Sequence, residues 1–217
     1  VKNLLIEKCG IAEENVMGIL DSAATGEGIV DALAALKDQS QPDDSVLIWY
    51  SGHAFPDSPQ GTYLVPHDFD SQNPDSTISA EKLHELITAI PARSKTVVLD
   101  THLNPKLVEL ARRDKGYALL LAEDSPKSQA AEASIDGRYF GVFTYELVQA
   151  LTKNLGAPLA KVKEQVEQGI AARKRFAQRP LFVCNKDDSF LMSAGTPADW
   201  LEAFDFALRR SYSASLI

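Results

Sequence analysis

A chain of 217 residues, 45% of them hydrophobic, is long enough to bury one sizeable core, which favours one domain with at most a partial second element. A net charge of −8 and a pI near 5.0 argue against a surface for nucleic acid or an anionic membrane, and the longest hydrophobic runs are far shorter than the ~20 residues of a membrane span. The two cysteines, Cys9 and Cys184, show no CxxC spacing, which argues against a disulfide framework or a cysteine zinc site and predicts a reducing, cytoplasmic location.

The first part of the chain alternates short hydrophobic strands with an amphipathic helix. Residues 15–20 (NVMGIL) have the pattern of a short strand, and a helix is expected over 25–39, with Thr25 as its N-cap. Residues 45–52 (SVLIWYSG) form a nearly continuous hydrophobic run, which is typical of a strand that is buried on both faces. A further short strand, 62–66 (TYLVP), ends at a proline.

The same alternation continues through the middle of the chain. A helix is expected over 78–90, capped by Ser79, and 96–102 (TVVLDTH) is the next buried strand. Asn104, followed by a proline, predicts the start of another helix, because the asparagine side chain caps and proline suits the first helical position.

The second half of the chain adds longer helices and a polar loop. A strand is expected over 117–124, followed by a long surface loop over 123–139. Two helices are expected over 141–156 and 158–177, and a final strand over 179–185. An amphipathic helix is then expected within 196–212, with three aromatic side chains for core or interface packing, Trp200, Phe204 and Phe206.

Strands that alternate with helices and are hydrophobic on both faces predict an α/β fold with a mainly parallel sheet and helices on each side. Ligands in such sheets bind beyond the carboxyl ends of the strands. The tripeptides SGH (51–53) and DTH (100–102) lie at two of those ends, so any site is expected there.

Four segments, read in order, resemble the caspase-like cysteine peptidases: LIWYSGHA, GTYLVPHDFD, KTVVLDTH, and YALLLAEDSPKSQAAEA with GVFTYELVQAL. The similarity covers about residues 15–191 and is greatest to the bacterial metacaspase-like branch, the orthocaspases. It implies a caspase-like three-layer sandwich over 1–194, with 195–217 as an extension or the start of another domain. It also implies that His53 occupies the place of the general base. Asp100 then occupies the place of the acid before the nucleophile, which in metacaspase-like members helps to select arginine or lysine.

The nucleophile of that family has no counterpart in this sequence. Aligned without a gap, its position falls on His102; with one residue deleted, His102 matches the histidine that follows the nucleophile. Thr101 offers a hydroxyl, but an internal threonine lacks the terminal amine that usually activates this nucleophile, so it is expected to be a strand residue. The sequence therefore favours a pseudopeptidase that acts as a binding or regulatory module. The alternative is an active endopeptidase that cleaves after basic residues with an unrecognised or trans-supplied nucleophile.

Several acidic side chains are candidates for binding a basic substrate residue. They follow predicted strands or lie in the loops near them: Asp68, Asp70, Asp100, Glu123 and Asp124. They predict either an acidic pocket for arginine or lysine or, equally, a set of solvated loop acids. Asp100 could also form a zinc site with His53 and His102, but this alternative is less favoured than a polar cluster at the strand ends. We therefore expect neither a metal nor a cofactor.

The expected partner is a peptide or protein with basic residues, or an active homologue, and not nucleic acid or a membrane. The resemblance also implies a possible homodimer, because caspase-like domains pair through sheet edges.

The beginning of the chain differs from the family pattern. Family members open with a central strand, whereas residues 1–11 (VKNLLIEKCGI) resemble the end of the helix that follows it. A missing central strand would leave unpaired backbone groups inside the sheet, which is costly. We therefore expect upstream sequence, another chain or the C-terminal extension to fill the gap.

Overall fold

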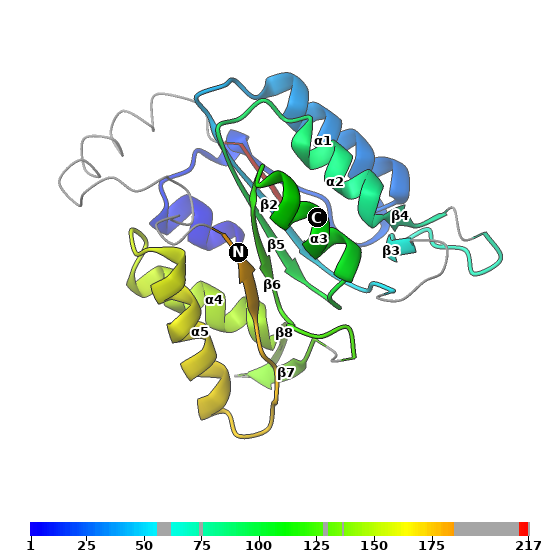
Figure 1. Ribbon diagram of the computed structural model, residues 1–217. Coiled ribbons are helices and arrows are strands. Elements are labelled where there is room, and N and C mark those ends of the chain that lie inside the picture. Colours follow the sequence, from blue (N-terminus) through cyan, green and yellow to red (C-terminus); the bar gives the residue numbers. More distant parts are fainter. Residues whose placement is uncertain (56–61, 74–75, 128–129, 136, 185–212, 217) are drawn as a thin grey trace.

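The computed structural model describes residues 1–55, 62–73, 76–127, 130–135, 137–184 and 213–216. Its central sheet contains six strands in the order β1–β10–β2–β5–β6–β9 (Figure 1). Their bounds are Val16–Gly18, Ser213–Leu216, Ser45–Ser51, Ser94–Asp100, Ala118–Leu121 and Leu181–Val183. All neighbouring pairs are parallel except β6 and β9, so β9 is an antiparallel edge strand.

The centre of the sheet is buried on both faces. In β2, Ile48 and Tyr50 belong to the hydrophobic cluster on one face, and Leu47 and Trp49 belong to the cluster on the other. This alternation follows from the two-residue period of a strand, and it explains why the run 45–52 has hardly any polar residue. The prediction of an α/β fold with a mainly parallel sheet is confirmed.

Helices cover both faces of the sheet, which gives three layers (Figure 1). On one face lie α1, α2 and α3, with bounds Gly26–Gln39, Ala80–Thr88 and Pro105–Asp114. On the other face lie α4 and α5 together with the short π-helix η1, with bounds Val142–Lys153, Leu159–Ala172 and Leu4–Lys8. Two short 3-10 helices flank β1, η2 over Glu13–Asn15 and η3 over Asp21–Ala23.

The predicted helix starts are confirmed by their caps. The hydroxyls of Thr25 and Ser79 accept hydrogen bonds of 3.0 Å from the N–H groups of Gly28 and Lys82. The Asn104 amide oxygen accepts from the first N–H groups of α3 at 2.9 and 3.1 Å. In each case a side chain satisfies backbone donors that the helix itself leaves unpaired.

The strand β10 fills the gap that the sequence leaves beside β1. It lies between β1 and β2 and is parallel to both, with Ala214 opposite Val16 on one side and Leu47 on the other. Of the three expected sources, the C-terminal extension is the one that supplies the strand. Residues 213–216 are therefore part of the central sheet, while the expected helix within 196–212, with Trp200, Phe204 and Phe206, lies outside the described residues.

Two small antiparallel sheets lie apart from the central one. The predicted strand 62–66 is present as β3 (Thr62–Leu64), and it pairs with β4 (Ile78–Ser79). The polar stretch 123–139, which the sequence predicts as a long surface loop, instead forms in part a hairpin of β7 (Glu132–Ile135) and β8 (Arg138–Gly141). None of its strand residues is fully buried, and the alternation of exposed and half-buried residues in β7 covers only four residues, too few to predict a strand. Gly137 supplies a positive φ of 78° at the turn.

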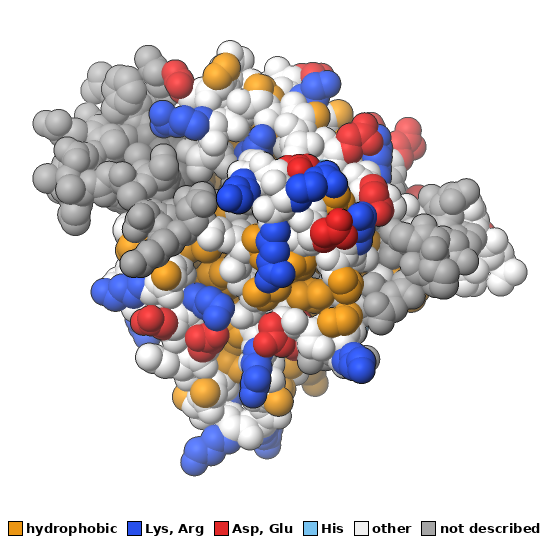
Figure 2. Space-filling view, viewed as in Figure 1, with side chains coloured by type: hydrophobic (Ala, Val, Ile, Leu, Met, Phe, Trp, Pro, Cys, Tyr) orange, Lys and Arg blue, Asp and Glu red, His pale blue; other side chains and the backbone are white. Residues whose placement is uncertain are grey.

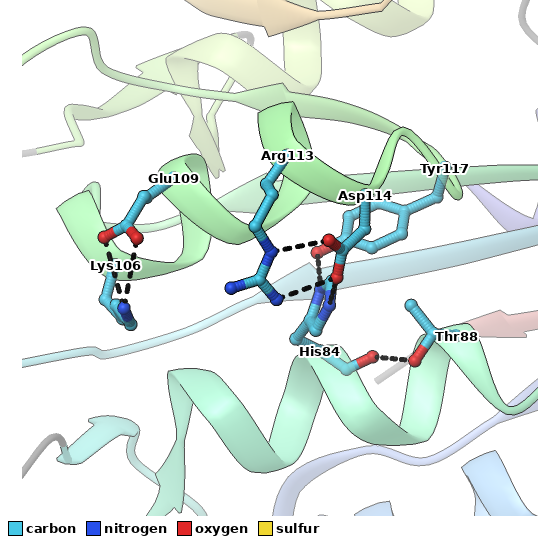
Figure 3. A network of polar contacts seen from close by, with 7 residues as sticks. All are labelled: His84, Thr88, Lys106, Glu109, Arg113, Asp114 and Tyr117. Carbon is cyan, nitrogen blue, oxygen red and sulfur yellow. Dashed lines mark hydrogen bonds and ion pairs between the residues drawn. The ribbon is translucent and has the colours of Figure 1, made fainter.

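A buried histidine joins α2 to the end of α3 (Figure 3). His84, which is 8% exposed, contacts the Tyr117 hydroxyl through Nδ1 at 3.0 Å and the Asp114 carboxylate through Nε2 at 2.8 Å. Arg113 holds the same carboxylate through two nitrogens, at 2.6 and 3.0 Å. These contacts fix the two helices to each other on one face of the sheet.

The face that carries β9 is apolar at its centre. Figure 2 shows hydrophobic side chains gathered across the middle of this face, with lysine and arginine side chains among them. The residues of β9 are half-buried, as expected for an edge strand. Within the described ranges, none of the helices has the length and hydrophobicity to cross a bilayer.

Candidate functional site

The register of the sheet brings the two predicted site histidines to neighbouring strand ends. The last paired residues of β2 and β5 are Ser51 and Asp100, and each histidine follows two residues later. Because adjacent strands lie about 4.8 Å apart, His53 and His102 emerge side by side at the carboxyl edge of the sheet. The pKa of His102 is lowered, mainly by burial and further by His53, whose positive charge would oppose a second one.

Two tyrosines hold the backbone at these histidines. The Tyr50 hydroxyl donates to the carbonyl of His53 at 2.7 Å, and the Tyr63 hydroxyl donates to the carbonyl of His102 at 2.9 Å. Burial raises the pKa of Tyr50 to about 12 and that of Tyr63 further, so both remain protonated donors. The sequence does not mark them as functional residues, since a tyrosine in a strand is an ordinary core residue. The one related signal in the sequence is the glycine at position 52. The structure explains it, because a Cβ on Gly52 would lie 2.7 Å from the Tyr50 hydroxyl oxygen.

Asp100 points to the start of α4. It is 5% exposed, and its carboxylate accepts a hydrogen bond from the backbone N–H of Thr144 at 3.0 Å. Gly141 gives it room, because a Cβ at that position would overlap the carboxylate. Burial raises the pKa of Asp100, the hydrogen bonds from Thr144 lower it in part, and nearby Glu132 adds to the rise. The carboxylate therefore serves as an N-terminal cap for α4, whose own N-cap residue has no side chain.

The hydroxyl of Thr101 is not prepared as a nucleophile. Thr101 is 1% exposed, and its Oγ1 atom is buried with no hydrogen-bond partner in the described part of the chain. A hydroxyl needs an aligned base to attack, and none contacts this one. The expectation that Thr101 is a strand-end core residue agrees with this placement.

The two thiols lie away from the histidines. Cys9 belongs to the hydrophobic cluster under α4 and α5, and burial raises its pKa to about 12. Cys184 follows β9, which runs antiparallel to β6, so its backbone lies beside Ala118 at the amino end of the sheet. At about 3.3 Å per residue, that end is roughly 20 Å from the edge that holds His102. Both cysteines are free thiols.

The five predicted acidic residues do not share one set of contacts. Asp68 accepts a hydrogen bond of 2.8 Å from the first N–H of α1, at Gly26. Asp70 accepts from the N–H of Gln72 at 2.9 Å, within its own loop. Both side chains are exposed, as in the solvated-loop interpretation.

The other two acids follow β6 and differ from each other in burial. Glu123 is 1% exposed, whereas Asp124 is exposed and lines a cavity beside α5. The pairing of β5 with β6 puts both near the histidine edge, because Leu99 is opposite Leu121. The cavity that Asp124 lines contains none of the other four acids. The structure thus brings Asp100, Glu123 and Asp124 to one edge but does not join the five into one pocket.

The less favoured zinc set has no geometric support. Asp100 is turned to α4, and no group of three or more histidine, cysteine, aspartate or glutamate side chains could hold a metal ion within the described ranges. The edge provides two imidazoles, one of them with a lowered pKa, and backbone that two tyrosines fix. Such an arrangement can accept protons and hydrogen-bond a polar ligand.

Comparison with known proteins identifies one family. The family model described as Caspase domain matches residues 4–191, which is most of the chain. The curated proteins contain no match to this sequence.

Proposed function

Because the chain belongs to the caspase-domain family, we propose that it is a member without a cysteine nucleophile, a pseudopeptidase of the metacaspase-like branch that binds a peptide or protein partner in the cytoplasm. One observation carries the proposal. The strand end beside His53, where a caspase-like peptidase presents its thiol, presents the imidazole of His102.

The chemistry of this edge supports the proposal. Proton transfer from a nucleophile requires the base and the nucleophile to lie within hydrogen-bond reach. The buried Thr101 hydroxyl makes no hydrogen bond to a base in the described part of the chain, and the pKa of the Cys9 thiol, about 12, leaves almost no thiolate near neutral pH. His53 then has no proton to take, and the edge retains the ability to bind without the ability to cleave.

A basic segment of the partner suits the charge of the protein. The net charge is −8, and Asp68, Asp70 and Asp124 are exposed carboxylates on loops that follow the strands. Opposite charge accelerates association and selects the partner, more than it adds affinity. A peptide with arginine or lysine, or an active homologue with such a segment, is the partner that we propose.

The alternative is an active endopeptidase that cleaves after basic residues with a thiol from another chain. The retention of a histidine and an acid at the two family positions, His53 and Asp100, favours it. In that case the partner chain would have to place a sulfur atom beside the His53 ring.

A cleavage assay separates the two. The purified chain is incubated with fluorogenic peptides that end in arginine, lysine or aspartate, alone and with a candidate homologue. We expect no turnover by the chain alone, and the same trace for wild type and His53→Ala. Turnover that His53→Ala abolishes would refute the pseudopeptidase.

A binding assay with the same basic peptides tests the partner. We expect binding that weakens severalfold in Asp100→Asn, which removes the charge but keeps an acceptor for Thr144. Asp38→Asn, an exposed acid near the end of α1, is the matched control and should bind as wild type does. Equal affinity of all three proteins would exclude Asp100 from recognition.

A further inference from the structure

A cavity of about 590 Å³ lies beside α5, where the chain turns back from that helix to β9. The helix ends at Ala172, and Lys174 adopts a positive φ of 51° at the turn. The returning segment then passes over the last turns of α5 and leaves a hollow between them. The size is within the ~300–1,000 Å³ that is usual for small-ligand sites.

The walls of the cavity are apolar and its mouth is charged. Ile170, Phe176 and Leu181 are the large apolar side chains. At the mouth, Lys163 and Glu167 pair with each other at 2.6 Å, whereas neither Asp124 nor Arg179 has an ion pair within the described ranges. An apolar side chain would fit the walls, and the mouth offers both signs of charge.

One polar side chain in the wall lacks hydrogen-bond partners in the described part of the chain. Gln178 lines the cavity and is 8% exposed, and neither its amide nitrogen nor its amide oxygen has a hydrogen-bond partner in the described part of the chain. A buried polar group that makes no hydrogen bond costs about 1–3 kcal/mol. Native proteins rarely leave both ends of an amide in this state without a use.

We propose that this cavity binds a short peptide segment, whose main-chain peptide group pairs with the Gln178 amide and whose apolar side chain packs against Ile170, Phe176 and Leu181. A peptide group is the natural complement, because it offers one donor and one acceptor, as the amide does. Charged ligands would leave one end of the amide unpaired.

The inference does not depend on the proposed function of the histidine edge. The cavity is built from α5, the segment that returns to β9, and Asp124, and neither histidine lines it. Asp124 is the one residue that it shares with the acids proposed to attract a basic partner. Substitutions at His53 or Asp100 should therefore leave binding in the cavity unchanged. A protein that binds no basic peptide at the histidine edge can still bind a peptide segment in the cavity. Likewise, a protein that binds nothing in the cavity can still bind a basic peptide at the histidine edge.

The test uses N-acetyl-leucine amide as the probe and the intact chain. Its titration is followed by NMR and by thermal unfolding. We expect shifts of the Ile170 and Leu181 resonances and a higher unfolding midpoint. In Gln178→Leu we expect at least a tenfold loss of affinity. We also expect a higher midpoint for the free protein, since the substitution removes two unpaired polar atoms.

The combination distinguishes a binding residue from a structural one. If Gln178 were merely structural, Gln178→Leu would lower the midpoint and leave the affinity unchanged, which would overturn the proposal. Gln168→Leu, at an exposed position of α5, is the matched control and should alter neither quantity. Ala177→Trp, at an exposed position of the lining, should block the probe without a change in the core. Absence of any resonance shift at millimolar probe would also refute the site.

Discussion

The carboxylate of Asp100 accepts a hydrogen bond from the backbone N–H of Thr144, 44 residues later in the chain, at 3.0 Å. This contact joins the end of β5 to the start of α4, and Gly141 leaves the space for it. The residue that the resemblance assigns to substrate selection therefore has a structural task as well. The capping role and the proposed role in recognition can be separated by experiment, because capping needs an acceptor atom, whereas attraction of a basic residue needs a charge.

Two substitutions of Asp100 should change the free energy of unfolding in opposite directions. Asp100→Ala removes the cap and should lower the free energy of unfolding by about 1 kcal/mol. Asp100→Asn keeps an oxygen acceptor and removes the charge that burial disfavours, so at neutral pH it should be at least as stable as wild type. Urea denaturation of the three proteins measures both changes.

The pH dependence gives a second test. The folded-state pKa of Asp100 is raised, so the folded protein holds this proton to higher pH than the unfolded chain does. Its contribution to stability is therefore greatest in acid and declines as the pH rises from the unfolded pKa, near 3.9, through the raised folded value. The advantage of Asp100→Asn over wild type should grow over that interval and then stay constant. An advantage that shrinks with rising pH would contradict the burial of an ionisable carboxyl here.

The two cysteines should differ in reactivity. Thiolate is the reactive form, and a pKa of about 12 keeps Cys9 protonated in the folded protein. Iodoacetamide at pH 8 should modify the half-buried Cys184 first, and Cys9 only after denaturant is added; peptide mass spectrometry identifies each site. Neither rate should change in His53→Ala. Fast labelling of Cys9 in native protein, slowed by that substitution, would reveal a thiol–imidazole pair and contradict the pseudopeptidase.

The contacts of His84 predict a coupled pair with Tyr117. A neutral ring with its proton on Nε2 donates to Asp114 and accepts the tyrosine O–H at Nδ1, which satisfies both nitrogens. His84→Leu leaves the buried Tyr117 hydroxyl unpaired and should cost about 1–3 kcal/mol. Adding Tyr117→Phe should recover part of this loss, so the double variant should be less destabilised than the sum of the single variants. Additive losses would show that the contact contributes nothing.

Asp114 should contribute to the acid sensitivity of the same network. Hydrogen bonds from Arg113 and His84 lower its pKa, so the folded protein favours the ionised carboxylate. The stabilisation is present above the unfolded pKa, near 3.9, and is lost as the pH falls towards the lowered folded value. Asp114→Asn should therefore be less stable than wild type at pH 7, with a difference that narrows in acid. Because the carboxylate is partly exposed, salt should also reduce the difference.

The sequence predicts the local features of this protein well. Thr25, Ser79 and Asn104 cap helices that begin within three residues of them, so the cause and its effect lie in one short window. The buried strands are equally visible, because both faces of β2 are covered and no polar residue interrupts its core. The position of His53 and His102 at one edge follows from two such strands once they are taken as neighbours.

Features that depend on distant segments are not visible in the sequence. The hairpin β7–β8 has no fully buried strand residue, and the alternation in β7 covers only four residues, so the sequence gives too short a pattern to reveal it. The capping role of Asp100 depends on where α4 begins, and the unpaired amide of Gln178 depends on how the chain returns over α5. The sequence predicts that a central strand is missing, but three sources could supply it, since a four-residue strand is too short to indicate its partner.

The position of β10 predicts a strong effect of proline at Ala214. A central strand is paired on both sides, and proline removes a donor and fits only at edges, so Ala214→Pro should cost about 3 kcal/mol or more. Ala12→Pro is a suitable control, because Ala12 already has φ −60° and ψ 140°, the backbone that proline prefers. Hydrogen exchange should show lost protection at Val16–Gly18 in Ala214→Pro, with β6 and β9 still protected, since they lie at the other end of the sheet. If Ala214→Pro were as stable as Ala12→Pro, with β1 equally protected, β10 could not be the strand that completes the sheet.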